Sequence, residues 1–292
     1  ARFSTGGSTH ANQAIILALG KPGDKVAITR TAHRSVLSAL VLTGLEPIWL
    51  TPEIDNATGV PMGIPVSELE RVLDQKPIAL LLTEPGYLGT ISDLSALITK
   101  AHQNSIPVII DAAWGAHFGF NPNIPQHVLQ LGADALITSV HKALPGYSAS
   151  ALLLAQGKFL NLARIEQSFE TTHTTSPAGA PLASIDGCRA LLQTRGEALT
   201  GDLLKHAVDF KHQVQSHFDQ PIFLNAEDFA AGRFDPVKIV LRANLLGLSG
   251  IDVEKQLQKA NIRVEMADRD TIVFLATLAD NAEDFRSEEH TS

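Results

Sequence analysis

The stretch ADALITSVHKALPGYSAS, residues 133–150, decides the fold. Its apolar run at 135–137 is typical of a buried strand, and Ser139, His141 and Lys142 follow before a Pro-Gly turn. An amine at the mouth of a buried strand is partly desolvated, which lowers its pKa toward the range in which lysine can form a Schiff base. Most lysines are solvated surface residues, so this position alone leaves a surface role and a reactive role open.

On both sides of this stretch, amphipathic helical patterns alternate with short β-branched runs from about residue 8 to residue 155. Runs that are apolar on both faces and alternate with helices predict an α/β fold, a mainly parallel sheet covered by helices. The expected helices are 10–20, 34–44, 94–104 and 126–131, and the expected strands are 25–30, 46–52, 79–85, 107–113 and 133–139.

The composition indicates a soluble globular protein, with 292 residues of which 45% are hydrophobic and 18% charged. A net charge of −8 argues against a nucleic-acid partner, because no Lys/Arg stripe is present to neutralise phosphates. The single cysteine, Cys188, excludes an intrachain disulfide framework, so we expect a reducing, cytoplasmic setting. No apolar run approaches the roughly 18 to 20 residues of a membrane span.

Both ends of the chain look artificial. The chain begins with ARFSTGG and has no initiator methionine, so we expect a natural N-terminal portion to be missing. The last seven residues, RSEEHTS at 286–292, resemble the translation of a common sequencing-adapter oligonucleotide. We exclude them from the fold and expect the C-terminal portion to be truncated as well.

The texture of the sequence changes beyond about residue 205. We expect a large domain at 1–205 and a smaller α+β C-terminal domain at 206–285, with the boundary near 205–220. The smaller domain is predicted from strand patterns at 236–243, 262–270 and 271–279 and a helical pattern at 250–260.

Asp111 ends the predicted strand PVIID. A buried carboxylate without a partner costs several kcal/mol, so a partner is required. That partner is either an N-cap bond to the following turn or the protonated nitrogen of a pyridine ring. Asp111 and Lys142 lie 31 residues apart, about one strand-helix-strand unit, so they can occupy neighbouring strand ends, where such sheets bind ligands.

The segment GGSTHAN, residues 6–12, precedes the first helical pattern. Glycines followed by Ser8 and Thr9 at a helix N-terminus favour an anion such as a phosphate, although a simple helix cap explains the same residues. The segment matches neither a Walker A loop nor a dinucleotide GxGxxG.

Two histidines follow strand ends. His33 in RTAHRS is either a turn or helix-cap residue or a flat ring that stacks on an aromatic ligand. His141 either makes a structural hydrogen bond near the strand end or, with Ser139, serves the same ligand as Lys142.

Two other chemistries are weaker. The run GYSAS, residues 146–150, lacks the last glycine of a G-x-S-x-G nucleophile elbow. The histidines form no H-E-x-x-H pair, so we expect no metal site. A phosphate cradle, a stacking histidine, a strand-end aspartate and Ser-x-His-Lys together point to pyridoxal phosphate, whose phosphate, ring, pyridine nitrogen and aldehyde each find a partner.

Taken as an ordered set, these segments resemble the fold-type I pyridoxal-phosphate enzymes, and among them the prokaryotic ornithine/lysine/arginine decarboxylase family. The resemblance covers almost all of residues 3–190, and the tail from 236 on resembles the start of the family's C-terminal domain. The matching segments are GSTHAN, RTAHRSV, LTEPGYLGTISDL, IPVIIDAAWGAHFGF, ADALITSVHKALPGYSAS and THTTSPAG.

The resemblance implies a role for each matched residue. Lys142 would bind the cofactor aldehyde, and Asp111 would pair with the pyridinium nitrogen. His33 would stack on the ring, although the motif reads HRS here and HKS in the family, and Trp114 would lie beside the cofactor. Thr174 would reach the phosphate of a neighbouring subunit, which implies a homodimer or higher homo-oligomer. The phosphate would be held by Ser8, Thr9, Ser139 and His141.

The implied activity is decarboxylation of arginine, lysine or ornithine to agmatine, cadaverine or putrescine. An aminotransferase or lyase of the same fold, or an inactive scaffold that binds the cofactor, is the alternative. A basic substrate requires an acidic partner, for which Glu84 is a candidate unless it is only the turn residue before Pro85.

Overall fold

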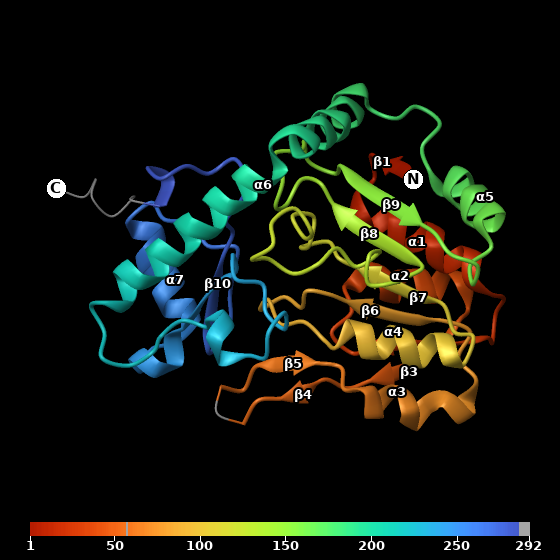
Figure 1. Ribbon diagram of the computed structural model, residues 1–292, viewed down its shortest axis with the longest axis horizontal. Coiled ribbons are helices and arrows are strands. Elements are labelled where there is room, and N and C mark those ends of the chain that lie inside the picture. The colour runs from red at the N-terminus through yellow and green to blue at the C-terminus, as the bar shows by residue number, and fades with distance from the viewer. Residues whose placement is uncertain (57, 286–292) are drawn as a thin grey trace.

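A seven-stranded sheet forms the centre of the computed structural model, which describes residues 1–56 and 58–285 (Figure 1). Its strand order is β1-β9-β8-β7-β6-β2-β3, in which β3, β2, β6, β7 and β8 are parallel and β9 runs antiparallel to β8 and to β1. The strands are β1 (Arg2–Ser4), β2 (Lys25–Thr29), β3 (Glu46–Leu50), β6 (Leu80–Thr83), β7 (Val108–Asp111), β8 (Ala135–Ser139) and β9 (Ala151–Ala155). The suspected adapter sequence, 286–292, lies outside the described residues.

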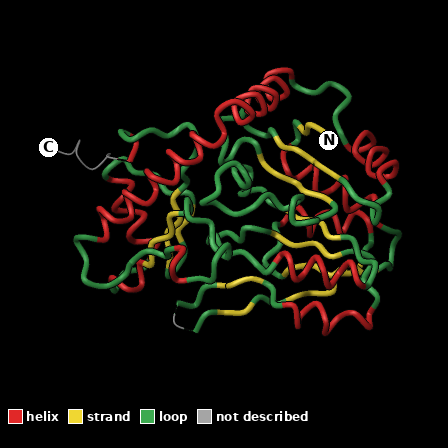
Figure 2. Tube along the Cα trace, viewed as in Figure 1, coloured by secondary structure: helices red, strands yellow, loops and turns green. Residues whose placement is uncertain are grey.

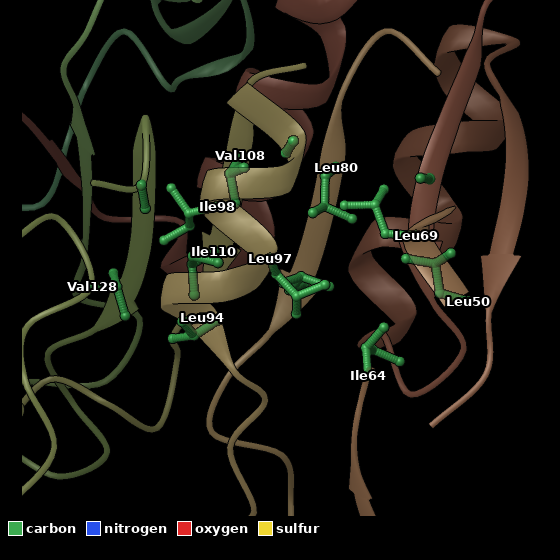
Figure 3. Close-up of a cluster of buried hydrophobic side chains, with 14 of the residues drawn as sticks. Leu50, Ile64, Leu69, Leu80, Leu94, Leu97, Ile98, Val108, Ile110 and Val128 are labelled. Atoms are coloured by element: carbon green, nitrogen blue, oxygen red, sulfur yellow. The ribbon is translucent and has the colours of Figure 1, made fainter. Parts of the chain in front are cut away.

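Helices cover both faces of this sheet, as predicted. On one face, the core joins Ile15, Val36 and Ile165 of α1, α2 and α5 to the strands. On the other, Leu69 of α3 and Leu97 of α4 pack over β6 and β7 (Figure 3). The helices are α1 (Gly7–Leu19), α2 (Arg34–Thr43), α3 (Val66–Val72), α4 (Leu94–Gln103) and α5 (Leu162–Thr172). The predicted α/β fold class, with a mainly parallel sheet, is confirmed.

The predicted helix at 126–131 is wrong. The crossover from β7 to β8 consists of turns and irregular loop, without a helix (Figure 2). The six-residue apolar pattern between Pro125 and Gly132 is too short to offset the cost of starting a helix. Val128 nevertheless packs, from a turn, in the same core cluster as residues of α4.

The C-terminal part of the chain has its own three-stranded antiparallel sheet, in the order β10-β12-β11. Its elements are β10 (Ile239–Arg242), α7 (Gly250–Lys259), β11 (Met266–Ala267) and β12 (Thr271–Phe274), in agreement with the strand and helix patterns predicted there. The remaining elements are the β4 (Glu53–Ile54) and β5 (Pro61–Gly63) ribbon and the short 3₁₀ helices η1 (Leu73–Gln75), η2 (Ala226–Asp228) and η3 (Ala243–Leu246).

One long helix, α6 (Gly179–Gln215), connects the two sheets (Figure 1). The domain boundary expected near 205–220 therefore begins inside a helix. Ile185 and Leu203 of α6 belong to one core cluster with Val140 beyond β8 and Ile239 of β10. Within the described ranges, no helix combines the length and the apolar character that crossing a membrane requires.

Candidate active site

A cavity of about 370 Å³ opens at the carboxyl ends of the parallel strands. Thr83, Asp111 and Ser139, the last residues of β6, β7 and β8, all line it. The parallel register pairs Thr83 with Asp111 and Asp111 with Ile137, so these strand ends are neighbours. The structure brings together in this cavity eight of the residues that the sequence singled out: Ser8, Thr9, His33, Asp111, Trp114, Ser139, His141 and Lys142.

A chain of hydrogen bonds links the Asp111 carboxylate through Asn12 and Ser35 to His33. The Asn12 side-chain amide donates to Asp111 Oδ2 at 2.8 Å and to Ser35 Oγ at 3.1 Å, and Ser35 Oγ lies 2.8 Å from His33 Nδ1. The Ala113 N–H donates to Asp111 Oδ1 at 3.2 Å, so the turn bond considered as an alternative is also present. Neither Asn12 nor Ser35 was predicted to belong to the site, although Asn12 lies within GGSTHAN.

Among the described residues, Asp111 forms none of the ion pairs that the structure shows. Burial raises its pKa, against the hydrogen bonds from Asn12 and Ala113 and the charges of Lys142 and His33, which lower it. A cation placed opposite the carboxylate would stabilise its ionised form. The protonated nitrogen of a pyridine ring fits this position.

The Lys142 amine lies close to the end of the neighbouring strand. Burial lowers its pKa, while the charges of Asp111 and Glu265 oppose the shift. Its Nζ atom is 4.2 Å from the centre of the Trp114 ring. Burial favours the uncharged amine, which is the nucleophilic form of lysine, whereas the two carboxylates and the face of the Trp114 ring favour the ammonium.

The N-terminus of α1 and the end of β8 form the anion-binding part of the cavity. Gly7 has a left-handed φ of 69°, and its N–H donates to Ala149 O at 2.7 Å. Ser8 and Thr9 follow in the first helical turn, where backbone N–H groups have no intrahelical acceptor. Ser8 Oγ lies 2.8 Å from Ser139 Oγ. Two hydroxyls beside free N–H groups suit a phosphate.

His33 is both a helix cap and a wall of the cavity. Its Nδ1 accepts the Ser35 N–H at 3.2 Å and so caps α2. Burial lowers its pKa, Lys142 and Arg34 lower it further, and Asp111 opposes them. The neutral imidazole that results suits stacking on a flat ring.

His141 makes the structural bond that was weighed against a cofactor role. Its Nδ1 donates to Ser150 O at 2.7 Å, which fixes the ring next to Lys142. The side chain also lines the cavity, so the two interpretations are compatible.

Three residues of this region gave no local sequence signal: Tyr87, Lys238 and Glu265. The Tyr87 ring lies 5.5 Å from that of Trp114, and its hydroxyl donates to Glu265 Oε1 at 3.1 Å. The Lys238 Nζ is 3.7 Å from the centre of the Trp114 ring. Lys238 and Glu265 belong to the C-terminal part of the chain, which therefore contributes to the surroundings of Lys142.

Thr174 lies outside the cavity of its own chain. It is exposed, in the segment between α5 and α6, and its Oγ1 accepts the Ser176 N–H at 3.2 Å. A contact with a neighbouring subunit stays a prediction.

Glu84 holds a loop. Its carboxylate accepts the Ser92 N–H at 3.0 Å and also accepts a hydrogen bond from the Ser92 hydroxyl. Glu84 lines a small cavity that adjoins the main one, with Thr31, Thr83 and Tyr87 common to both, but Glu84 does not line the main cavity. This geometry favours the turn role of Glu84 over a role as the acidic partner of the substrate.

Glu84 is expected to make the protein less stable as the pH rises. Burial raises its pKa to about 7, against the two Ser92 hydrogen bonds. Below the usual glutamate pKa both the folded and the unfolded chain are protonated; above it the unfolded chain releases its proton first, so stability falls until about pH 7. The free energy of unfolding lost in this pH range is about 3 kcal/mol. Glu84→Gln has no proton to release, so it is expected to avoid this loss and to have a higher free energy of unfolding at pH 8 than the wild type.

Urea unfolding at pH 5 and pH 8 measures this effect. Glu53→Gln, which removes an exposed carboxyl, is the matched control and should leave the pH dependence of the wild type in place. An unchanged pH dependence in Glu84→Gln would contradict the assignment.

Comparison with known proteins agrees with this geometry. The family described as Orn/Lys/Arg decarboxylase, major domain, matches residues 1–231. An arginine decarboxylase of Bacillus subtilis is 34% identical over 291 residues, which cover 97% of this chain and 59% of the relative. A lysine decarboxylase of Pseudomonas aeruginosa is 26% identical over 238 residues, which cover 73% of this chain and 31% of the relative. The chain thus spans less than two thirds of the length of these relatives.

Solved structures agree on the fold. The constitutive lysine decarboxylase of Escherichia coli matches with a TM-score of 0.82 at 20% identity, over 98% of this chain and 47% of that one. Aminotransferases match the same fold. The fold is therefore that of the fold-type I pyridoxal-phosphate enzymes, and the Asp111, Lys142 and anion-binding positions fit that cofactor. The chain belongs to the ornithine/lysine/arginine decarboxylase family, as the sequence motifs predicted, and pyridoxal phosphate is the cofactor of that family.

Proposed function

We propose that this chain carries the active site of a pyridoxal-phosphate-dependent decarboxylase that converts arginine, lysine or ornithine to the corresponding amine and carbon dioxide. One observation carries the proposal: a buried carboxylate, Asp111, and a partly buried amine, Lys142, line the same cavity at the ends of adjacent strands. Membership of the decarboxylase family supports the choice of reaction.

The residues of the chain divide the work of holding the cofactor. Asp111, supported by Asn12, pairs with the ring nitrogen, and His33 orients the ring. Ser8, Thr9 and Ser139 bind the phosphate. Bound pyridoxal phosphate supplies a ring that accepts the electron pair left when carbon dioxide departs.

Two groups just beyond β8 can return a proton to the α-carbon after carbon dioxide has left. Lys142 Nζ, once free of the cofactor, or the ring of His141 delivers a proton to the α-carbon before the amine leaves. Because burial lowers the pKa of Lys142, its ammonium form is a stronger proton donor than the ammonium of an exposed lysine.

The distal cation of a basic substrate requires an acidic group near the cavity. Glu265 accepts a hydrogen bond from Tyr87, which lines the cavity, and its charge acts on Lys142. Glu265 is therefore better placed than Glu84 to pair with that cation.

The test is carbon dioxide release from arginine, lysine and ornithine in the presence of pyridoxal phosphate, with the product amine identified by chromatography. Norleucine has the backbone of a long-chain amino acid without the distal cation and is the control substrate. We expect one basic amino acid to react about 100-fold faster than norleucine, because a charged group left unpaired in the site is costly. Equal rates, or no carbon dioxide, would contradict the proposal.

The same assay separates the alternatives. An aminotransferase would form a keto acid without carbon dioxide, and a non-catalytic homologue would bind the cofactor without either product. The fold is common to these classes, so the products decide between them.

We also propose a homodimer or higher homo-oligomer with shared active sites. Thr174 supports this arrangement because it is exposed and lies outside its own cavity, where it is free to approach the phosphate of a second copy.

A further inference from the structure

Lys238 is a second buried lysine beside the active site. It is 5% exposed and immediately precedes β10 in the C-terminal part of the chain. Its Nζ lies 3.7 Å from the centre of the Trp114 ring, and the Lys142 Nζ lies 4.2 Å from the same centre. The two nitrogens can be no farther apart than the sum of these distances, which is shorter than the screening length of physiological salt.

The position of Lys238 is fixed from several directions. Its N–H donates to Asp235 O at 3.0 Å, and Asp235 Oδ1 lies 3.1 Å from His117 Nε2, in a pair of which each member is 1% exposed. The Asp235 N–H donates to Gly89 O at 2.8 Å. Gly89 has a φ of 91°, and a Cβ there would approach Lys238 Cβ and Cγ to 2.9 Å. The lysine stem therefore requires a glycine beside it.

The two lysines act on each other electrostatically. Burial lowers the pKa of Lys238 to about 8, Lys142 lowers it further, and Asp235 and Glu265 oppose these effects. Repulsion between two charges is mutual, so a charged Lys238 disfavours the charged form of Lys142 as well. The other titratable groups that face the pair are Asp111, His33, His141, Tyr87, Glu265 and Asp235.

We propose that Lys238 is a positioning residue that acts through Lys142: its ammonium, held against Trp114, favours the uncharged form of the Lys142 amine, which is the form that attacks a carbonyl. The proposal rests on the proposed function, in which Lys142 holds the cofactor. It assigns to the C-terminal part of the chain an effect on the reactive amine that needs no contact with cofactor or substrate.

The experiment is trace acetylation of the cofactor-free protein with acetic anhydride between pH 6 and pH 10, with the label at Lys142 read by peptide mass spectrometry. Only the uncharged amine attacks the anhydride, forming an amide and releasing acetate, and the neutral reagent does not respond to electrostatic attraction. Lys238→Met is expected to lower the labelling rate of Lys142 at pH 7 about tenfold. Lys238→Arg keeps the charge and is expected to label like the wild type.

Lys211→Met is the matched control. Lys211 is also buried, at 4% exposure, and its Nζ donates to Pro236 O at 3.2 Å, next to Asp235 in the chain. Its removal takes away a buried charge without touching Trp114, so Lys142 should label at the wild-type rate. An unchanged Lys142 rate in Lys238→Met, an equal fall in Lys211→Met, or a failure of Lys238→Arg to retain the wild-type rate would each overturn the proposal.

The wild-type protein provides a test that does not depend on the folding of any variant. Because the two lysines are coupled, Lys142 is expected to titrate over a wider pH range than a single site does. A single-site curve with the midpoint of an ordinary exposed lysine would overturn the proposal. Labelling uses neither cofactor nor substrate, so its outcome is separate from any failure to release carbon dioxide.

Discussion

Replacing Lys142 by alanine is expected to remove the visible absorbance band of the bound cofactor and to lower the rate of carbon dioxide release by about 10⁴-fold or more. Among the described residues that line the cavity, Lys142 is the only lysine, so its loss removes the amine that we propose holds the aldehyde. The absorbance spectrum with added pyridoxal phosphate and the release assay measure the two effects.

Lys158→Ala is the control for this experiment. Lys158 is exposed after β9 and contacts the ring of Phe159, away from the cavity residues. It should keep both the band and the activity. A band that persists in Lys142→Ala would move the attachment to another lysine and would contradict the assignment.

Replacing Asp111 by asparagine is expected to lower carbon dioxide release by at least about 100-fold, because the charge that sustains the protonated ring nitrogen is lost. The amide has the shape of the carboxylate, and the Asn12 amide can turn over to present its oxygen, so the fold should persist. The release assay under saturating cofactor measures the loss.

The same substitution is expected to stabilise the cofactor-free protein at pH 8. Burial raises the pKa of Asp111 in the folded chain, so above the usual aspartate pKa the unfolded chain releases its proton first and stability falls as the pH rises. Asparagine carries no proton to lose, and the Tm at pH 8 should rise. An active and less stable Asp111→Asn protein would contradict both expectations.

Asp134→Asn is the matched control. Asp134 is equally buried, but it lies at the opposite end of β8, where its Oδ2 accepts the Val108 N–H at 2.8 Å and lies 2.8 Å from His102 Nε2. Its replacement should lower the Tm and leave the rate per folded molecule unchanged.

The strands that carry the site were predictable because each is a short apolar run with a polar residue at its exit. The spacing of Asp111 and Lys142 predicts that they can occupy neighbouring strand ends. In the structure β7, which ends at Asp111, is the parallel neighbour of β8, and Lys142 lies just beyond the end of β8. The antiparallel strand β9 was not predicted, because pairing direction depends on the path of the whole chain. The prediction of a helix at 126–131 was wrong because an apolar pattern of that length also fits a buried turn.

Other parts of the site could not be predicted because their signal is tertiary. Asn12 looks like an ordinary polar residue in a helix until its burial beneath Asp111 is known. In the sequence, Lys238 is one residue of the strand pattern at 236–243, and Glu265 is one residue of the strand pattern at 262–270. Only folding brings them to Trp114 and Tyr87, which lie more than one hundred residues away in the sequence.

The shared core around α6 has a consequence for folding cooperativity. Val140 and Leu144, which flank Lys142 in the chain, pack in the same cluster as Ile222 and Ile272 of the C-terminal part. The loop that carries Lys142 therefore packs on residues of both sheets. Unfolding of the C-terminal part alone would expose the apolar side chains Val140 and Leu144 of this loop to water, which is unfavourable. We therefore expect the two sheets and the Lys142 loop to unfold together as one cooperative unit.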